Sequence, residues 1–313
     1  MTALAQRRTS TGDRLRAAWP WLRILIGVGI VGALVARLDT HTFADGLRAI
    51  TPGEVLAALA IGMVTTVLCA GRWCLVARRL GLRLELGTAV AGYYRAIFLN
   101  SVLPAGVLGD VHRAVRHGRQ EGDVGRGVRA VVLERVAGQS ILVLAGVAAL
   151  LLGPAVAPVR GLVLIILAVT VALGLALAAG WRWSRAGSRW RRTVEDARAG
   201  LLAREAWPGV AVLSMAALAG HVTLFVVAAR AAGASAPITE LVPLVVLSLL
   251  AMGLPVNVGG WGPREGVAAL VFGSAGLGAA LGLTTAVVYG VLALVSSLPG
   301  AGVLLLRRRS VDA

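Results

Sequence analysis

Apolar runs of about 20 residues recur along the whole chain, and this feature constrains the fold more than any other. A helix of about 20 residues is long enough to cross the roughly 30 Å hydrocarbon core of a bilayer. Hydrophobic residues make up 58% of the 313 residues and charged residues only 15%, with a mean hydropathy of +0.82. Soluble globular domains are far more polar. The sequence therefore predicts an all-α polytopic membrane protein.

Uninterrupted apolar runs predict about six transmembrane helices. They cover residues 22–38, 54–77, 128–152, 161–181, 208–232 and 278–304. Two further apolar stretches, 88–116 and 239–277, are each broken in the middle by Pro and Gly. Irregular backbone at membrane depth is tolerated only where protein or a water-filled cavity satisfies it. We therefore predict that each stretch is a re-entrant helical hairpin that faces inward.

The distribution of positive charge predicts the topology. All 31 basic residues are Arg, and the formal net charge is +16. With the N-terminus cytoplasmic, 22 of them fall in inner segments and only four in outer loops, as the positive-inside rule requires. The sequence thus predicts a cytoplasmic Arg-rich N-terminus (1–21), an interfacial helix within 181–207 and a cytoplasmic tail (307–313). This pattern indicates topology rather than nucleic-acid binding.

Signatures of soluble enzymes are missing from the sequence. Cys69 and Cys74 lie in one apolar run, so they indicate neither a disulfide framework nor a metal cluster. No P-loop or dinucleotide-binding motif is present, and no Ser/His/Asp or Cys/His arrangement stands out. We therefore expect no cofactor, no metal and no ATP-driven pumping by this chain alone.

The two broken stretches resemble each other. Residues 103–113 (LPAGVLGDVHR) align without gaps onto residues 254–264 (LPVNVGGWGPR) at an offset of 151 residues. Both follow the pattern L-P-x-x-V-x-G-x-x-x-R. The sequence therefore predicts one repeat over 22–152 and a second over 161–304. Because each repeat crosses the membrane an odd number of times, the second must be inverted, as in many transporters.

Several charged residues follow the two breaks. Asp110 is predicted to be the N-cap of the helix that carries Arg113. Pro263 suits a first helical turn, and Glu265 is favourable near a helix N-terminus. A helix N-terminus with an adjacent Arg is a ready site for an anion such as phosphate. The alternative is that the acids only cap helices while Arg113 and Arg264 extend to the headgroups.

Ionisable residues also lie within the predicted spans. Glu134 and Arg135 follow the first hairpin, and charges inside a span usually face a partner or cavity. Local pairing of Glu134 with an interfacial Arg is the alternative. Arg72 and Arg95 are interpreted as snorkelling to the membrane boundary, and His221 as a packed, hydrogen-bonded histidine. Two amides near the breaks, Asn100 and Asn257, can satisfy freed backbone groups.

Three motifs resemble those of the lysylphosphatidylglycerol synthase transmembrane-region family, whose members include the membrane half of bacterial multiple peptide resistance factors. They are NSVLPAGVLGDVHRA, VVLER and LPVNVGGWGPREG. The resemblance covers residues 20–305. The residues that match the first two motifs are Pro104, Gly109, Arg113, Glu134 and Arg135. Those that match the third are Gly259, Gly260, Gly262, Arg264, Glu265 and Gly266.

The resemblance implies a flippase-like membrane domain over 22–306, in the bacterial plasma membrane, with both termini cytoplasmic. Its implied partners are anionic, aminoacylated or polyprenyl-linked lipids, with a separate synthase or transferase and a second copy of the chain as further candidates. Two departures stand out. The aminoacyltransferase domain of full-length relatives is not in this sequence, so we expect no enzyme. Relatives also carry an Arg in the last span where this chain has Gly290.

Together these features predict a lipid translocase. In this hypothesis lipid phosphate docks at Arg264 and the half-helix N-termini, and Arg113 and Arg135 offer further cationic steps. The acids Asp110, Glu134 and Glu265 balance the Arg charges, receive a cationic headgroup or carry a coupling proton. One alternative is a membrane scaffold that recruits a lipid- or sugar-modifying transferase. Another is an intramembrane transferase with a catalytic carboxylate.

Overall fold

The computed structural model describes residues 50–103, 106–152, 206–253 and 262–308, together with residues 48, 161 and 164. This part of the chain folds into helices and contains no strand, which confirms the all-α prediction. Four of its helical segments are long and apolar enough to cross a membrane: α3 (Pro52–Arg79), α6 (Val124–Leu152), α9 (Trp207–Ala231) and the segment Ala279–Leu304. The predicted span 22–38 lies outside the described residues. Of the predicted span 161–181 only residues 161 and 164 are described, and of the segment 181–207 with the predicted interfacial helix only residues 206 and 207.

Four shorter helices form two hairpins. In the first, α4 (Leu86–Val102) packs against α5 (Leu108–Gln120), and in the second, α10 (Ile238–Ala251) packs against α11 (Pro263–Ser274). Even the longest, with 17 residues, spans only about 25 Å at 1.5 Å per residue. That length falls short of a bilayer core of roughly 30 Å. The lengths therefore agree with hairpins that enter and return rather than with full crossings.

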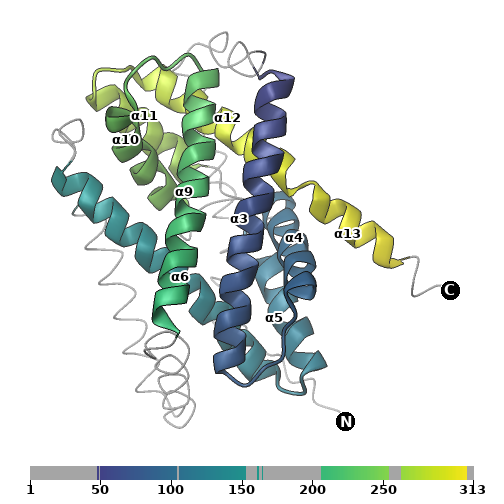
Figure 1. Cartoon of the computed structure of the whole chain (residues 1–313). Coiled ribbons are helices and arrows are strands. Elements are labelled where there is room, and N and C mark those ends of the chain that lie inside the picture. Colours follow the sequence, from purple (N-terminus) through teal and green to yellow (C-terminus); the bar gives the residue numbers. More distant parts are fainter. Residues whose placement is uncertain are drawn as a thin grey trace, which may run out of the picture.

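The last span is divided, where the sequence predicts a single helix. Helix α12 (Ala279–Ser297) ends before Pro299, which begins α13 (Pro299–Arg308). Proline has no backbone N–H and its ring clashes with the preceding helical turn, so it breaks a continuous helix. Gly300 then brings the start of α13 against the backbone of α4 at Tyr94. Figure 1 shows α13 extending beyond the rest of the bundle.

The two halves of the described chain contain the same order of helices, and the second half is oriented opposite to the first (Figure 1). Each half has a long helix, a hairpin and a second long helix. Helices α3 and α9 lie side by side and run antiparallel (Figure 1). The α4–α5 hairpin lies toward one end of the bundle and the α10–α11 hairpin toward the other (Figure 1). This arrangement is the inverted repeat that the sequence predicts.

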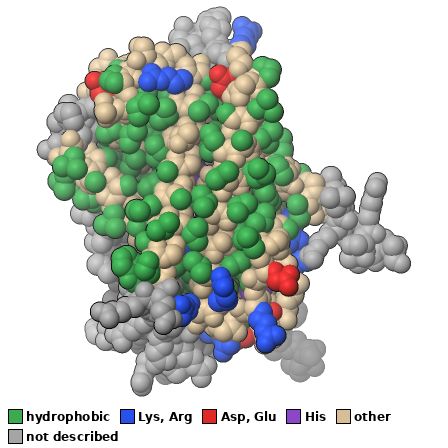
Figure 2. Space-filling view, viewed as in Figure 1, with side chains coloured by type: hydrophobic (Ala, Val, Ile, Leu, Met, Phe, Trp, Pro, Cys, Tyr) green, Lys and Arg blue, Asp and Glu red, His purple; other side chains and the backbone are tan. Residues whose placement is uncertain are grey.

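The face of the bundle drawn in Figure 2 is apolar between two charged ends. Figure 2 shows hydrophobic side chains over the middle of this face, with Arg, Asp and Glu side chains mainly near its two ends. Large apolar side chains such as Met63, Leu144 and Met215 are more than half exposed. A soluble monomer rarely exposes so much contiguous apolar surface. Acyl chains of a bilayer are its natural surroundings.

Candidate functional site

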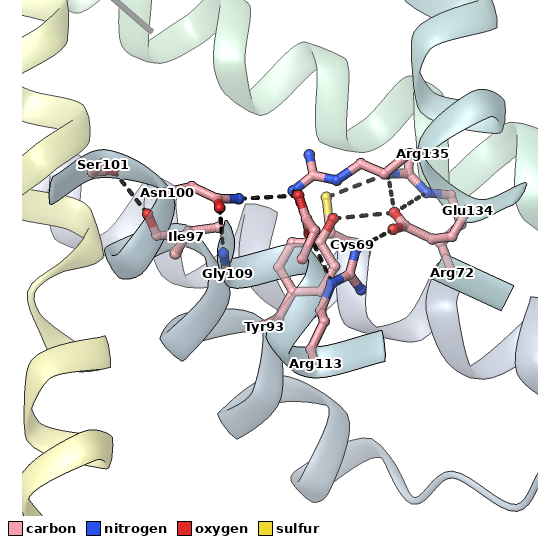
Figure 3. Close-up of polar contacts among 11 residues, drawn as sticks. Cys69, Arg72, Tyr93, Ile97, Asn100, Ser101, Gly109, Arg113, Glu134 and Arg135 are labelled. Atoms are coloured by element: carbon pink, nitrogen blue, oxygen red, sulfur yellow. Dashed lines mark hydrogen bonds and ion pairs between the residues drawn. The ribbon is translucent and has the colours of Figure 1, made fainter. Parts of the chain in front are cut away.

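A buried carboxylate, Glu134 on α6, collects donors from three other helices (Figure 3). Its side chain is fully buried. Its Oε1 accepts hydrogen bonds from Arg72 Nε on α3 at 3.0 Å and from Tyr93 Oη on α4 at 3.1 Å. Its Oε2 accepts one from Arg113 Nη2 on α5 at 2.6 Å. A buried carboxylate is tolerated only when it is paired and hydrogen-bonded in this way.

A second carboxylate, Asp110 on α5, extends this network. Its Oδ1 accepts a hydrogen bond from Arg113 Nε at 2.9 Å. Its Oδ2 lies 2.7 Å from Arg135 Nη2 and accepts a hydrogen bond from Asn100 Nδ2 at 3.0 Å. We call these five charged residues the first ionic cluster: Arg72, Asp110, Arg113, Glu134 and Arg135. Three guanidinium groups and two carboxylates give the cluster a formal charge of +1.

Exposure increases from one side of the first ionic cluster to the other. The side chains of Arg72, Arg113 and Glu134 are 6%, 1% and 0% exposed. Asp110 is 14% exposed and Arg135 is 44% exposed. The pair formed by Arg135 and Asp110 is therefore the accessible edge of an otherwise sealed network.

Aromatic rings hold the Arg113 guanidinium in place. Its Cζ lies 4.7 Å from the centroid of the Trp73 ring and 4.3 Å from that of Tyr93. The negative face of an aromatic ring attracts a cation, more strongly when water is excluded. Arg113 thus bonds both carboxylates and contacts two rings, so it is an organising residue of the cluster. Its burial excludes the interpretation that it extends to the headgroups.

The start of α5 differs from the prediction in one respect. Asp110 is not the N-cap, because Val107 precedes the helix and Asp110 is already its third residue. The carboxylate of Asp110 is instead turned to Arg113 and Arg135. Asn100 of α4 supplies the cap, since its Oδ1 accepts a hydrogen bond from the Gly109 backbone N–H at 2.8 Å. This contact confirms that Asn100 satisfies backbone freed at the break, whereas Asn257 lies outside the described residues.

Gly109 lies where α5 crosses α4. A Cβ atom at this position would lie only 2.1 Å from the backbone oxygen of Ala96. Since any side chain would separate the two helices, the close approach requires glycine. The same approach places the Gly109 N–H within reach of Asn100 and brings Asp110 and Arg113 toward α6.

The second hairpin carries a smaller ion pair at the start of α11. Arg264 Nε donates to Glu265 Oε1 at 3.0 Å, and both side chains are buried. Glu265 Oε2 accepts a hydrogen bond from the Gly262 backbone N–H at 2.7 Å, so Glu265 caps its own helix. Pro263 is the first residue of α11, as predicted, and Gly262 before it has a φ of +105°, which favours glycine. Arg264 Cζ lies 5.2 Å from the centroid of the Tyr289 ring.

One face of α9 contacts both Arg72 of the first ionic cluster and Tyr289, the residue whose ring lies against Arg264. Ser214 Oγ accepts a hydrogen bond from Arg72 Nη1 at 3.0 Å, and His221 Nδ1 lies 3.3 Å from Tyr289 Oη. Ser214 and His221 are seven residues apart and therefore share a helix face, two turns from each other. The hydrogen bond of His221 confirms the prediction, but its side chain is exposed rather than packed.

The two arginines that align in the sequence are not at equivalent positions in their helices. Helix α5 begins at Leu108 and α11 at Pro263, so the helix starts are 155 residues apart rather than 151. Arg113 is the sixth residue of α5 and Arg264 the second of α11. Arg113 therefore lies four residues, or about one helical turn, further into its helix than Arg264 does.

Some predicted site residues cannot be compared with the structure, and some residues of the site were not predicted. Pro104, Gly259 and Gly260 lie outside the described residues. Sequence reasoning missed Arg72, Tyr93 and Ser214. Arg72 and Arg95 are each only 5% exposed, so the snorkelling interpretation was wrong for both, and Arg264 is likewise buried. The available signal for Arg72 was a lone charge in an apolar span, which needs a partner elsewhere in the chain.

Guanidinium and carboxylate groups buried between membrane-length helices define a multi-pass membrane protein with a polar interior. Within the described residues, no group of His, Cys, Asp and Glu could hold a metal ion. The family model described as the lysylphosphatidylglycerol synthase transmembrane region matches residues 21–300. The chain belongs to this family, a membrane domain associated with lipid-related functions. A comparison with curated proteins found no match.

Proposed function

We propose that the chain is a lipid translocase that moves a phosphate-bearing lipid between the leaflets of the membrane. The observation that carries the proposal is the +1 charge of the first ionic cluster, whose four more buried members balance one another and whose excess charge lies at Arg135, on the partly exposed edge of an apolar bundle. An uncompensated charge in such surroundings is costly, and a bound anion lowers that cost. A phosphodiester group carries one negative charge and is the anionic group common to membrane phospholipids.

Arg135 is the residue that would receive the phosphate first. Its guanidinium is partly exposed and offers planar donors that suit phosphate oxygens. In the unloaded state Asp110 occupies these donors. We infer that phosphate exchanges with the Asp110 carboxylate at Arg135, while Arg72, Arg113 and Glu134 keep the rest of the cluster intact.

The inverted arrangement supports a second step at the other hairpin. Arg264 lies at the start of α11, which approaches the bundle from the opposite end (Figure 1). The polar side chains of Ser214 and His221 lie between the first ionic cluster and Tyr289, which lies against Arg264. A headgroup would pass along this face of α9 while its acyl chains remain against the exposed apolar surface.

The finer parts of the proposal rest on the family and on the distribution of Arg. We propose anionic, aminoacylated or polyprenyl-linked lipids as substrates, a bacterial plasma membrane as the location, and cytoplasmic termini. Translocation requires no covalent step, so we propose that the chain is not an enzyme. Synthesis of the lipid would fall to a separate protein.

Proteoliposomes that contain fluorescent phosphatidylglycerol test the proposal. The wild-type protein should transfer labelled lipid between leaflets, and Arg135→Gln should slow transfer at least tenfold. The matched control is Arg119→Gln, which removes an exposed Arg from α5 outside the cluster. Folding of each variant is checked by its elution profile in detergent and by thermal unfolding.

Three outcomes would overturn the proposal. If folded Arg135→Gln transfers lipid as fast as wild type, the first ionic cluster is not the lipid site. If the wild-type protein transfers no lipid and co-purifies with a stable transferase, the scaffold alternative replaces translocation. Release of a modified lipid by the purified protein would favour an intramembrane transferase instead.

A further inference from the structure

A small cavity lies between α4 and α5, above the side chain of Trp73 from α3. Its volume is about 20 Å³, which is enough for a water-sized group such as a phosphate oxygen. Thr88, His112 and Gln120 line it and are exposed, so the cavity lies directly beneath the surface of this hairpin. Asp110 and Glu134, the two carboxylates that bind Arg113 Nε and Nη2, are not among the residues that line it.

Three buried nitrogen atoms of the cavity wall have no hydrogen-bond partner among the described residues. They are Trp73 Nε1, Arg113 Nη1 and His117 Nε2. The three residues are 2%, 2% and 4% exposed, and all of them line the cavity. The rings of Trp73 and His117 meet edge to face, with centroids 5.5 Å apart, which holds both nitrogen atoms in one neighbourhood. Buried polar atoms without partners are rare, because each costs about 1–3 kcal/mol.

The charge around the cavity has one sign. Arg95 and Arg116 line it together with Arg113, and none of the described residues in its wall is acidic. Glu121, just beyond the end of α5, instead accepts a hydrogen bond from the backbone N–H of Arg83. Donors that converge beside several guanidinium groups suit an oxyanion.

We propose that this cavity is a second anion site that takes one oxygen of a phosphate group, with Trp73 and His117 donating hydrogen bonds and Arg113 and Arg116 supplying charge. The site goes beyond the proposed translocation, because it opens at the α4–α5 surface and does not include the Arg135–Asp110 edge. A lipid headgroup at the membrane boundary and a free phosphate offer the same chemistry.

The indole N–H of Trp73 reports on this site directly. Protein labelled with ¹⁵N at Trp is placed in dodecyl maltoside micelles, and the Trp73 signal is assigned by its loss in Trp73→Phe. Inorganic phosphate, short-chain phosphatidylglycerol and short-chain diacylglycerol are then titrated separately. Phosphate or phosphatidylglycerol should move the Trp73 signal downfield, as a new hydrogen bond does, and diacylglycerol should not.

Variants inside and outside the cavity wall test whether the Trp73 response comes from this site. Arg116→Gln and His117→Phe should each weaken the response at least tenfold, whereas Arg119→Gln should leave it unchanged. Arg135→Gln should also leave it unchanged, so failure of translocation and failure of this site are distinguishable. A response to phosphatidylglycerol alone assigns the site to a lipid headgroup, and a response to both probes assigns it to phosphate from either source. No response to either, or an equal response to diacylglycerol, overturns the proposal.

Discussion

Arg72 on α3 and Glu134 on α6, 62 residues apart in the sequence, form an ion pair inside the bundle. The pair joins the first long helix of one half to its last. In the other half, His221 on α9 and Tyr289 on α12 join the corresponding helices through a contact between neutral groups. The two halves therefore share an arrangement of helices but not the chemistry between them. Of these two contacts between long helices, only the one in the first half belongs to a cluster with an excess positive charge.

Removal of the central carboxylate should destabilise the fold. Glu134→Gln leaves three guanidinium groups with one carboxylate, and breaking a buried pair costs about 3–5 kcal/mol. We expect a large loss of thermal stability in detergent. The double variant Arg72→Gln/Glu134→Gln restores the net charge of the cluster and should be more stable than Glu134→Gln alone. If the destabilisation of the double variant equals the sum of those measured for Glu134→Gln and for Arg72→Gln alone, the two charges are not coupled.

Gly109→Ala should loosen the first hairpin. The new methyl group would overlap the backbone oxygen of Ala96, so α5 must shift away from α4 at a cost of about 1–3 kcal/mol. The control is Gly87→Ala at the start of α4, where a Cβ atom meets nothing within 4 Å. Thermal unfolding of the two variants checks the prediction. If they unfold at the same temperature, the close approach of α4 and α5 does not contribute to stability.

Arg264→Gln should slow lipid transfer about tenfold or more, which corresponds to at least about 1.4 kcal/mol in the barrier. Arg264→Lys keeps the charge but not the planar donors, so its rate should lie between those of wild type and Arg264→Gln. Arg230→Gln, an exposed Arg on α9 near the same end of the bundle, should transfer lipid at the wild-type rate. Wild-type transfer by folded Arg264→Gln would remove Arg264 from the proposed path.

The inverted arrangement predicts that the two hairpins open to opposite sides of the membrane. Starting from a variant without Cys69 and Cys74, single cysteines are placed at two exposed positions, Arg119 at the first hairpin and Ser235 before the second. In intact cells an impermeant thiol reagent should label Ser235→Cys, whereas Arg119→Cys should react only after the membrane is opened. Labelling of both positions from one side would contradict the inverted repeat.

Local signals in the sequence determined much of the fold. Apolar runs of membrane length predicted α3, α6 and α9, because hydropathy and length are properties of each segment alone. Pro and Gly in the middle of two stretches predicted the hairpins for the same reason. The start of α11 near Pro263 and a place for Glu265 at the helix N-terminus were also predicted, and capping by Glu265 was the stated alternative, since all of these depend on neighbours within one turn.

Only the tertiary structure decided which charges meet. The sequence offered two alternatives for each Arg in a span, extension to the headgroups or burial against a partner, and their energies depend on which face of the helix points inward. Arg72 is buried because Glu134 and Ser214, far away in the chain, face it. Asp110 is not a cap because Asn100 takes that role and leaves its carboxylate to two guanidinium groups. Segment hydropathy determined that the chain is a helical membrane protein, and contacts between distant helices determined its ionic cluster.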